Sequence, residues 1–124
     1  MKIKITFHDM PHSAPIEAHI HQKLERVARL LKESGEHTPY NIEMWVHGKK
    51  PHADYRSEIK LKTHKLDLNA HDFGTELYIT IDTAIDKLIR LINKTHEKLI
   101  DKIQKKKTEK NNFIEDDDKY TLSD

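Results

Sequence analysis

The sequence predicts an α+β fold in which four strands and two helices follow one another in the order βαβββα. Four short segments alternate apolar with polar residues, which is the period of a half-buried strand. Two longer segments repeat apolar residues every three or four positions, which is the period of an amphipathic helix. Because one face of a sheet can bury two such helices, we expect a four-stranded sheet with both helices packed on the same side.

The first strand and the first helix are predicted within the first 35 residues. The segment from Lys2 to Phe7 alternates polar with apolar residues, which predicts a strand. Ser13 is placed to cap a helix that accepts Pro15 in its first turn, and Gly35 marks its end. A helix between the first two strands favours a parallel pairing of these strands. The apolar face of the helix comprises Ile16, Ile20, Leu24, Val27 and Leu31.

Three strands and a long helix are predicted in the rest of the folded part. Residues 40–47 and 55–63 alternate, and a fourth strand begins near Leu66 and ends near Gly74. Thr75 is the expected cap of the second helix. The apolar face of this helix comprises Leu77, Ile81, Ile85, Leu88, Ile92, Leu99 and Ile103.

Length and composition favour one soluble domain of residues 1–107, followed by an acidic, disordered tail of residues 108–124. The chain has no cysteine, which excludes disulfides and thiolate chemistry and suits a reducing compartment. No apolar run approaches the roughly 18 residues of a membrane span. We therefore expect a cytoplasmic protein that is monomeric when free and makes no membrane contact.

Positive charge is concentrated on the second helix, although the whole chain carries only +1. Residues 87–107 contain eight Lys or Arg and two acids, a net charge of +6, whereas residues 108–124 carry −4. Five bases recur at helical spacing and occupy about a third of the helix circumference. These five are Lys87, Arg90, Lys94, Lys98 and Lys102. A basic stripe of this kind is suited to binding phosphate groups.

Two further basic elements support a polyanion-binding surface. Lys23, Arg26 and Arg29 recur every three residues beside the apolar face of the first helix, and Lys49 and Lys50 lie in a turn. The alternative is an ordinary solvated helix face whose bases pair with nearby acids. The candidate acids are Asp82, Asp86, Glu97 and Asp101. These acids project to one flank, which leaves the sector of the five bases almost free of acid, with Arg90 and Lys94 facing solvent.

The sequence gives little support to a metal site, a cofactor or an enzymatic activity. The histidine-rich segment from His8 to His21 lacks the spacing of metal ligands, because i,i+2 positions on a helix point to different faces. The sequence contains no nucleophile elbow, phosphate-binding loop or GxGxxG motif. Trp45 lies on the face opposite Ile42, Met44 and Val46, where it either stacks on an RNA base or is partly buried. Phe113-Ile114 in the tail either docks on a partner or has no role.

The second helix resembles the signature of the ribosome hibernation factors, through Glu76-Leu77-Tyr78, Ile81-Asp82, Ile85-Asp86-Lys87-Leu88, Arg90 and Lys94. The tail segment Asn112-Phe113-Ile114-Glu115 is similar to the end of the short-form protein Y subgroup, the ribosome-associated inhibitor A type. Thr63-His64-Lys65 replaces a turn that usually contains glycine in this family.

The resemblance implies a translation inhibitor that binds the small ribosomal subunit and the whole ribosome. Its site would be the channel of messenger RNA and transfer RNA, with contacts to ribosomal RNA phosphates and ribosomal proteins. The bases that match the family are Lys23, Arg26, Arg29, Lys87, Arg90, Lys94 and Lys98. A role in stress or stationary phase, and a tail that opposes ribosome dimerisation, are implied in the same way. A generic double-stranded RNA-binding module and a regulator that acts through its acidic tail are the competing interpretations.

Overall fold

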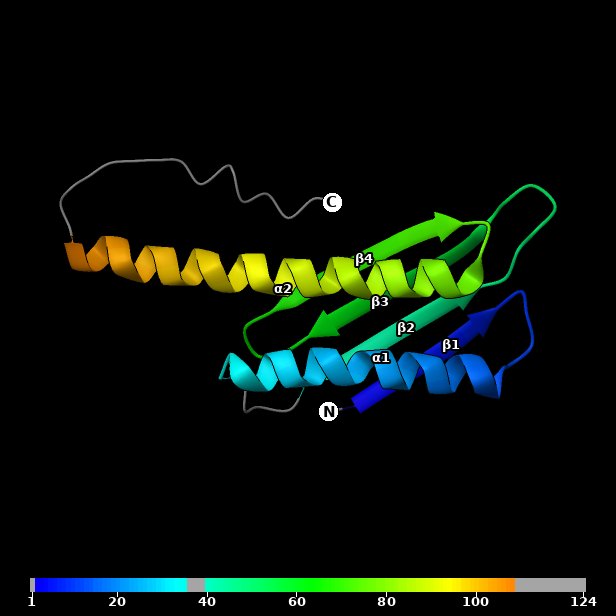
Figure 1. The fold of residues 1–124 in the computed structure, drawn as a ribbon, viewed down its shortest axis with the longest axis horizontal. Helices are drawn as coiled ribbons and strands as arrows, with labels where there is room; N and C mark the ends of the chain where they lie inside the picture. Colours follow the sequence, from blue (N-terminus) through cyan, green and yellow to red (C-terminus); the bar gives the residue numbers. More distant parts are fainter. Residues whose placement is uncertain (1, 36–39, 109–124) are drawn as a thin grey trace.

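The computed structural model describes residues 2–35 and 40–108, with side chains as far as Glu97. Its elements are β1 (Lys2–His8), α1 (Ala14–Glu33), β2 (Asn41–His47), β3 (Tyr55–Lys62), β4 (Asp67–Gly74) and α2 (Leu77–Thr108). Both helices lie on one face of a single sheet, and α2 continues past the end of the sheet (Figure 1). The predicted fold class is therefore confirmed, whereas the predicted tail of residues 108–124 lies outside the described residues apart from Thr108.

The four strands form a mixed sheet in the order β1-β2-β3-β4. β1 pairs with β2 in parallel, as expected for two strands joined through a helix, and the remaining pairs are antiparallel. The register aligns apolar side chains across the sheet, so that Met44 lies opposite Ile59 and Ile59 lies opposite Ala70. Since side chains alternate between the faces of a strand, this register sends one apolar layer toward the helices.

The core lies between this layer and the two helices. All five apolar residues predicted for α1 are buried, and Ile20 and Leu24 have no exposed surface. On α2, Leu77 is partly buried, and the side chains of Leu99 and Ile103 lie outside the described set. The buried apolar residues of α2 are Ile81, Ala84, Ile85, Leu88, Ile89, Leu91 and Ile92.

The turn between β3 and β4 forms without glycine because the Thr63 side chain satisfies two backbone donors. Its hydroxyl accepts hydrogen bonds from the N–H groups of Lys65 (3.0 Å) and Leu66 (2.8 Å). The Thr63 N–H in turn donates to the Leu66 carbonyl at 2.8 Å. A threonine hydroxyl can therefore hold a tight turn without glycine.

α2 begins slightly later than the sequence indicated. The helix starts at Leu77, and the Glu76 carbonyl accepts the Thr80 N–H at 3.1 Å. Accepting this first intrahelical bond is the property of an N-cap residue, so Glu76 occupies the position that the sequence assigned to Thr75. No helix within residues 2–35 and 40–108 combines the length and apolar character of a membrane span.

Candidate nucleic-acid interface

α1 and α2 lie side by side and are joined by charged side chains. The Asp82 carboxylate lies 2.7 Å from His19 Nε2 and 3.8 Å from Lys23 Nζ. One turn further along, Asp86 lies 3.8 Å from Arg26 Nη1. Two of the four acids predicted to project to one flank of α2, Asp82 and Asp86, therefore face α1, where they partly neutralise the predicted phosphate-binding bases Lys23 and Arg26.

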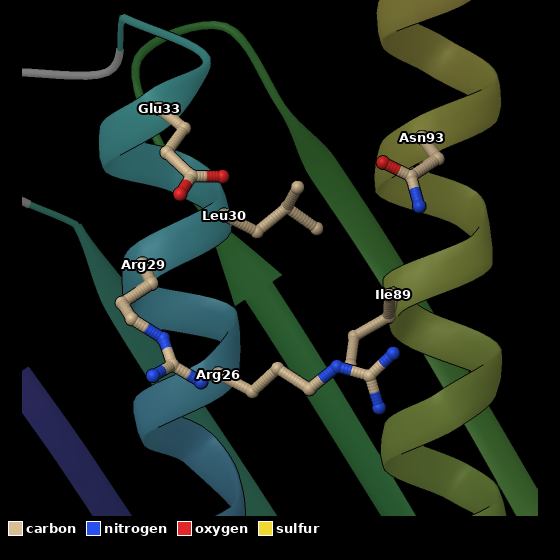
Figure 2. A pocket seen from close by; sticks show the side chains of 6 residues that line it. All are labelled: Arg26, Arg29, Leu30, Glu33, Ile89 and Asn93. Atoms are coloured by element: carbon tan, nitrogen blue, oxygen red, sulfur yellow. The ribbon is translucent and has the colours of Figure 1, made fainter.

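An open cleft of about 410 Å³ lies between the helices beyond these ion pairs. Figure 2 shows the Arg26 side chain extending from α1 toward α2. Arg29 also lines the cleft, and no ion pair within the described part of the chain involves it. The full lining is Arg26, Arg29, Leu30, Glu33, Ile89 and Asn93. Two guanidinium groups and one amide provide donors for phosphate oxygens, against a single carboxylate.

The bases of the predicted stripe on α2 differ in their exposure and in their neighbours. Lys87 Nζ donates to the His71 carbonyl (3.1 Å) and to Asp72 (3.3 Å) on β4, and its side chain is only 23% exposed. Arg90 and Lys94 were both predicted to face solvent. Arg90 is exposed, whereas Lys94 is half-buried, so the prediction is confirmed in full only for Arg90. The expectation that this sector is nearly free of acid is wrong at Lys87, because Asp72 comes from another element.

The remaining predicted bases lie in the β2–β3 turn and at the far end of α2. Lys50 Nζ lies 3.2 Å from Asp9, at the end of β1. Lys49 is exposed, and no ion pair among residues 2–35 and 40–97 includes it. The backbone of Lys98 and Lys102 is helical, but their side chains lie outside the described set. The structure therefore places the described bases on three elements, which are α1, the β2–β3 turn and α2.

Sequence reasoning missed Asn93 and the pairing of acids with α1. Asn93 lies four residues after Ile89, so helical phase places both residues on the same flank of α2. The signal that this flank faces α1 was the pair Asp82 and Asp86, one helical turn apart, whose partners Lys23 and Arg26 are also about one turn apart on α1. Within residues 2–35 and 40–97, no three histidine or acidic side chains are grouped in a way that could hold a metal ion.

The fold and the charges define a βαβββα domain that presents a basic cleft between two helices on one side of its sheet. Residues 3–100 match the model of the family described as sigma 54 modulation protein / S30EA ribosomal protein. The chain belongs to this family of ribosome-associated hibernation factors, which are not enzymes, as the sequence resemblance predicted.

Solved structures share the fold. A ribosomal subunit interface protein from Coxiella burnetii is 22% identical, with a TM-score of 0.64 and coverage of 77% of this chain and 97% of that chain. The N-terminal domain of Protein Y from Thermus thermophilus is 20% identical, with a TM-score of 0.59 and coverage of 71% and 91%. No curated protein sequence matches this chain.

Proposed function

We propose that this protein binds the small ribosomal subunit in the channel of messenger RNA and transfer RNA, and that it thereby inhibits translation and stabilises idle ribosomes in the cytoplasm. The observation that carries the proposal is the basic interhelical cleft, into which Arg26 extends toward α2 and which Arg29 also lines. Membership of a ribosome-associated family supports the same partner.

The mechanism rests on matching charged side chains to phosphates whose positions are fixed by folded RNA. Guanidinium groups donate two parallel hydrogen bonds to phosphate oxygens, and counterions released from the RNA contribute to affinity. The sequence contains no base-reading motif, so the shape of the ribosomal channel selects the site. A bound domain occupies space that messenger RNA and transfer RNA need, which explains inhibition without any chemical step.

Ribosome sedimentation tests this function. In lysate from growth-arrested cells, the protein should sediment with small subunits and whole ribosomes, and its absence from both would refute the proposal. Purified protein with Arg90→Glu should lose ribosome binding at moderate salt. Lys2→Glu changes the net charge equally at an exposed position on β1, and it should bind like the parent protein.

Competition separates this function from that of a general double-stranded RNA-binding module. Free RNA duplex should displace a general module from ribosomes at equal phosphate concentration, because such modules recognise the shape of any A-form helix. A ligand fitted to the ribosomal channel should remain bound under the same conditions. Efficient displacement by duplex would favour the general module instead.

A further inference from the structure

The face of the sheet opposite the helices carries a cluster of rings at one end. The β1–β2 register places His8 beside His47, and the next pairings place Arg56 beside His47 and Phe73 beside Arg56. In the neighbouring row, Trp45 and His71 lie on either side of Glu58. Residues two apart on a strand share a face, so both rows face away from the helices. We call His8, Trp45, His47, Arg56, His71 and Phe73 the ring platform.

Contacts between these side chains order the platform. The rings of His8 and His47 stack with centroids 4.9 Å apart and planes inclined by 13°. The Arg56 guanidinium carbon lies 5.4 Å from the centre of the Phe73 ring, and His71 meets that ring edge-on at 5.5 Å. An ion pair of 3.5 Å to Glu58 also holds Arg56. Neighbouring groups therefore orient the rings of His8, His47, His71 and Phe73 before any ligand arrives.

The platform remains open to a ligand. Phe73 is 59% exposed, the largest exposure among the large apolar side chains described. His8 and His71 are exposed, and Trp45 and His47 are half-buried. The half-burial of Trp45 agrees with the partial burial that the sequence offered as one alternative, and the side chain keeps accessible surface. Core packing does not require an exposed phenylalanine among exposed histidines, so burial does not explain this cluster.

The charges around the platform favour a ligand with phosphates. The exposed Lys49 lies in the β2–β3 turn, which leaves the sheet directly after His47, and its neighbour Lys50 is paired with Asp9. Lys60 lies on the same face as Arg56, two positions beyond Glu58, and is exposed. The acid within the platform, Glu58, is paired with Arg56. A ligand of flat rings joined by phosphates would meet ring faces over the strands and cations beside them.

His47 contributes an uncharged ring. Burial lowers the pKa of His47 below its usual value, and the nearby charges of His8 and Arg56 lower it further, while Glu58 and Asp9 act in the opposite direction. The neutral form is therefore favoured near pH 7, and a neutral imidazole is a flat ring that can stack without the desolvation cost of a charge.

We propose that the ring platform binds unpaired bases of single-stranded RNA, as a site separate from the basic helices. Adjacent strands are about 4.8 Å apart, and alternate residues along a strand about 7 Å apart. The Trp45 and Phe73 positions are thus spaced to take two splayed bases rather than two bases in one continuous stack. The stacking would be tolerant of sequence, because every base has a flat face.

The fluorescence of Trp45 provides a direct test, because it is the only tryptophan in the chain. The full chain is titrated with a ten-nucleotide single-stranded RNA and with an abasic oligomer that has the same number of phosphates. Stacking predicts saturable quenching by the RNA, with the abasic oligomer binding about 5- to 100-fold more weakly. Equal binding of both oligomers, or no quenching by the RNA, would overturn the proposal.

Ring-removing variants locate the site. Phe73→Leu keeps an apolar side chain but removes the ring, and RNA binding should weaken at least 5-fold, whereas Phe73→Trp should retain it. Ile79→Leu is a matched control at a similarly exposed position on α2 and should have no effect. Unchanged RNA binding by Phe73→Leu would overturn the assignment. Arg90→Glu should leave oligonucleotide quenching intact, so this proposal and ribosome binding through the helices can fail independently.

Discussion

A buried hydrogen bond between Ser57 and Thr80 joins β3 to the first turns of α2. The two hydroxyl oxygens lie 2.9 Å apart, and both residues have no exposed surface. Thr80 donates its only hydroxyl proton to the Leu77 carbonyl at 2.7 Å, so Ser57 must be the donor between the two hydroxyls.

This direction predicts unequal effects of removing each partner. Thr80→Val should cost about 1–3 kcal/mol in the free energy of unfolding, because it leaves the Ser57 hydroxyl buried without an acceptor. Ser57→Ala should cost only about 0.5–1.5 kcal/mol, since Thr80 keeps its bond to Leu77. Urea unfolding of both variants and of the double variant measures the difference. If Ser57→Ala proved the more damaging, the assigned donor would be wrong.

His47 predicts a pH dependence of stability. Burial and the charges of His8 and Arg56 lower its pKa in the folded state below the value of 6.5 that an unfolded chain would show. As the pH falls below about 6.5, His47 therefore binds a proton more readily in the unfolded state than in the folded state. The contribution of His47 to stability declines until the pH passes the folded pKa. Above this window the contribution does not change with pH.

Replacing the histidine should remove this part of the pH dependence. We expect His47→Asn to lose less stability than the parent between pH 7.5 and pH 5.5, as measured by urea unfolding at both values. His52→Asn is a matched control, because His52 is exposed in the turn after β2. An equal change in the parent and in His47→Asn would contradict the lowered pKa.

At the scale of elements, the pairing of α1 with α2 implies that acids partly neutralise the bases that we propose to bind phosphate. Asp86→Asn frees Arg26 from its partner 3.8 Å away and removes a negative charge beside the cleft. Ribosome binding should tighten about 2- to 5-fold, because a charge a few Å from a phosphate is worth up to about 1 kcal/mol in water. Both side chains are largely exposed, so stability should change little.

The control for this prediction is an ion pair of the same kind on a different element. Asp67 lies 3.7 Å from Lys62, and both side chains are about as exposed as those of Arg26 and Asp86. Asp67→Asn should therefore leave ribosome binding unchanged. Weaker binding by Asp86→Asn, measured by sedimentation at fixed salt, would show that Asp86 contributes to the interface instead of opposing it.

The elements also show what the sequence could and could not predict. Hydrophobic period identified every strand and helix and each buried residue of α1, because burial of one face follows directly from that period. The same period predicted which side of its helix Lys87 occupies, but it could not predict that Asp72 is its partner. Asp72 reaches Lys87 from β4, and a contact between elements distant in the chain leaves no periodic signal. The cleft beside Arg29 depends on helix packing in the same way.

At the scale of the whole molecule, the sheet separates the two proposed RNA-binding surfaces. The basic cleft lies among the helices, and the ring platform lies on the opposite face of the sheet. Trp45 could be assigned to that opposite face by alternation alone. That His71 and Phe73 lie near Trp45 could not be predicted in this way, because only the register of β2, β3 and β4 brings them together.

The helix surface is proposed to bind through charge and the ring platform through stacking, so salt should distinguish them. Arg90→Gln removes one cation from the helix surface and should reduce the slope of log affinity for ribosomes against log salt by about 0.7–0.9. Phe73→Leu changes no charge, so it should weaken RNA oligonucleotide binding by a similar factor at every salt concentration and leave that slope unchanged. Titrations between low and moderate salt measure both slopes. A slope altered by Phe73→Leu would mean that Arg56, rather than the ring, makes the decisive contact.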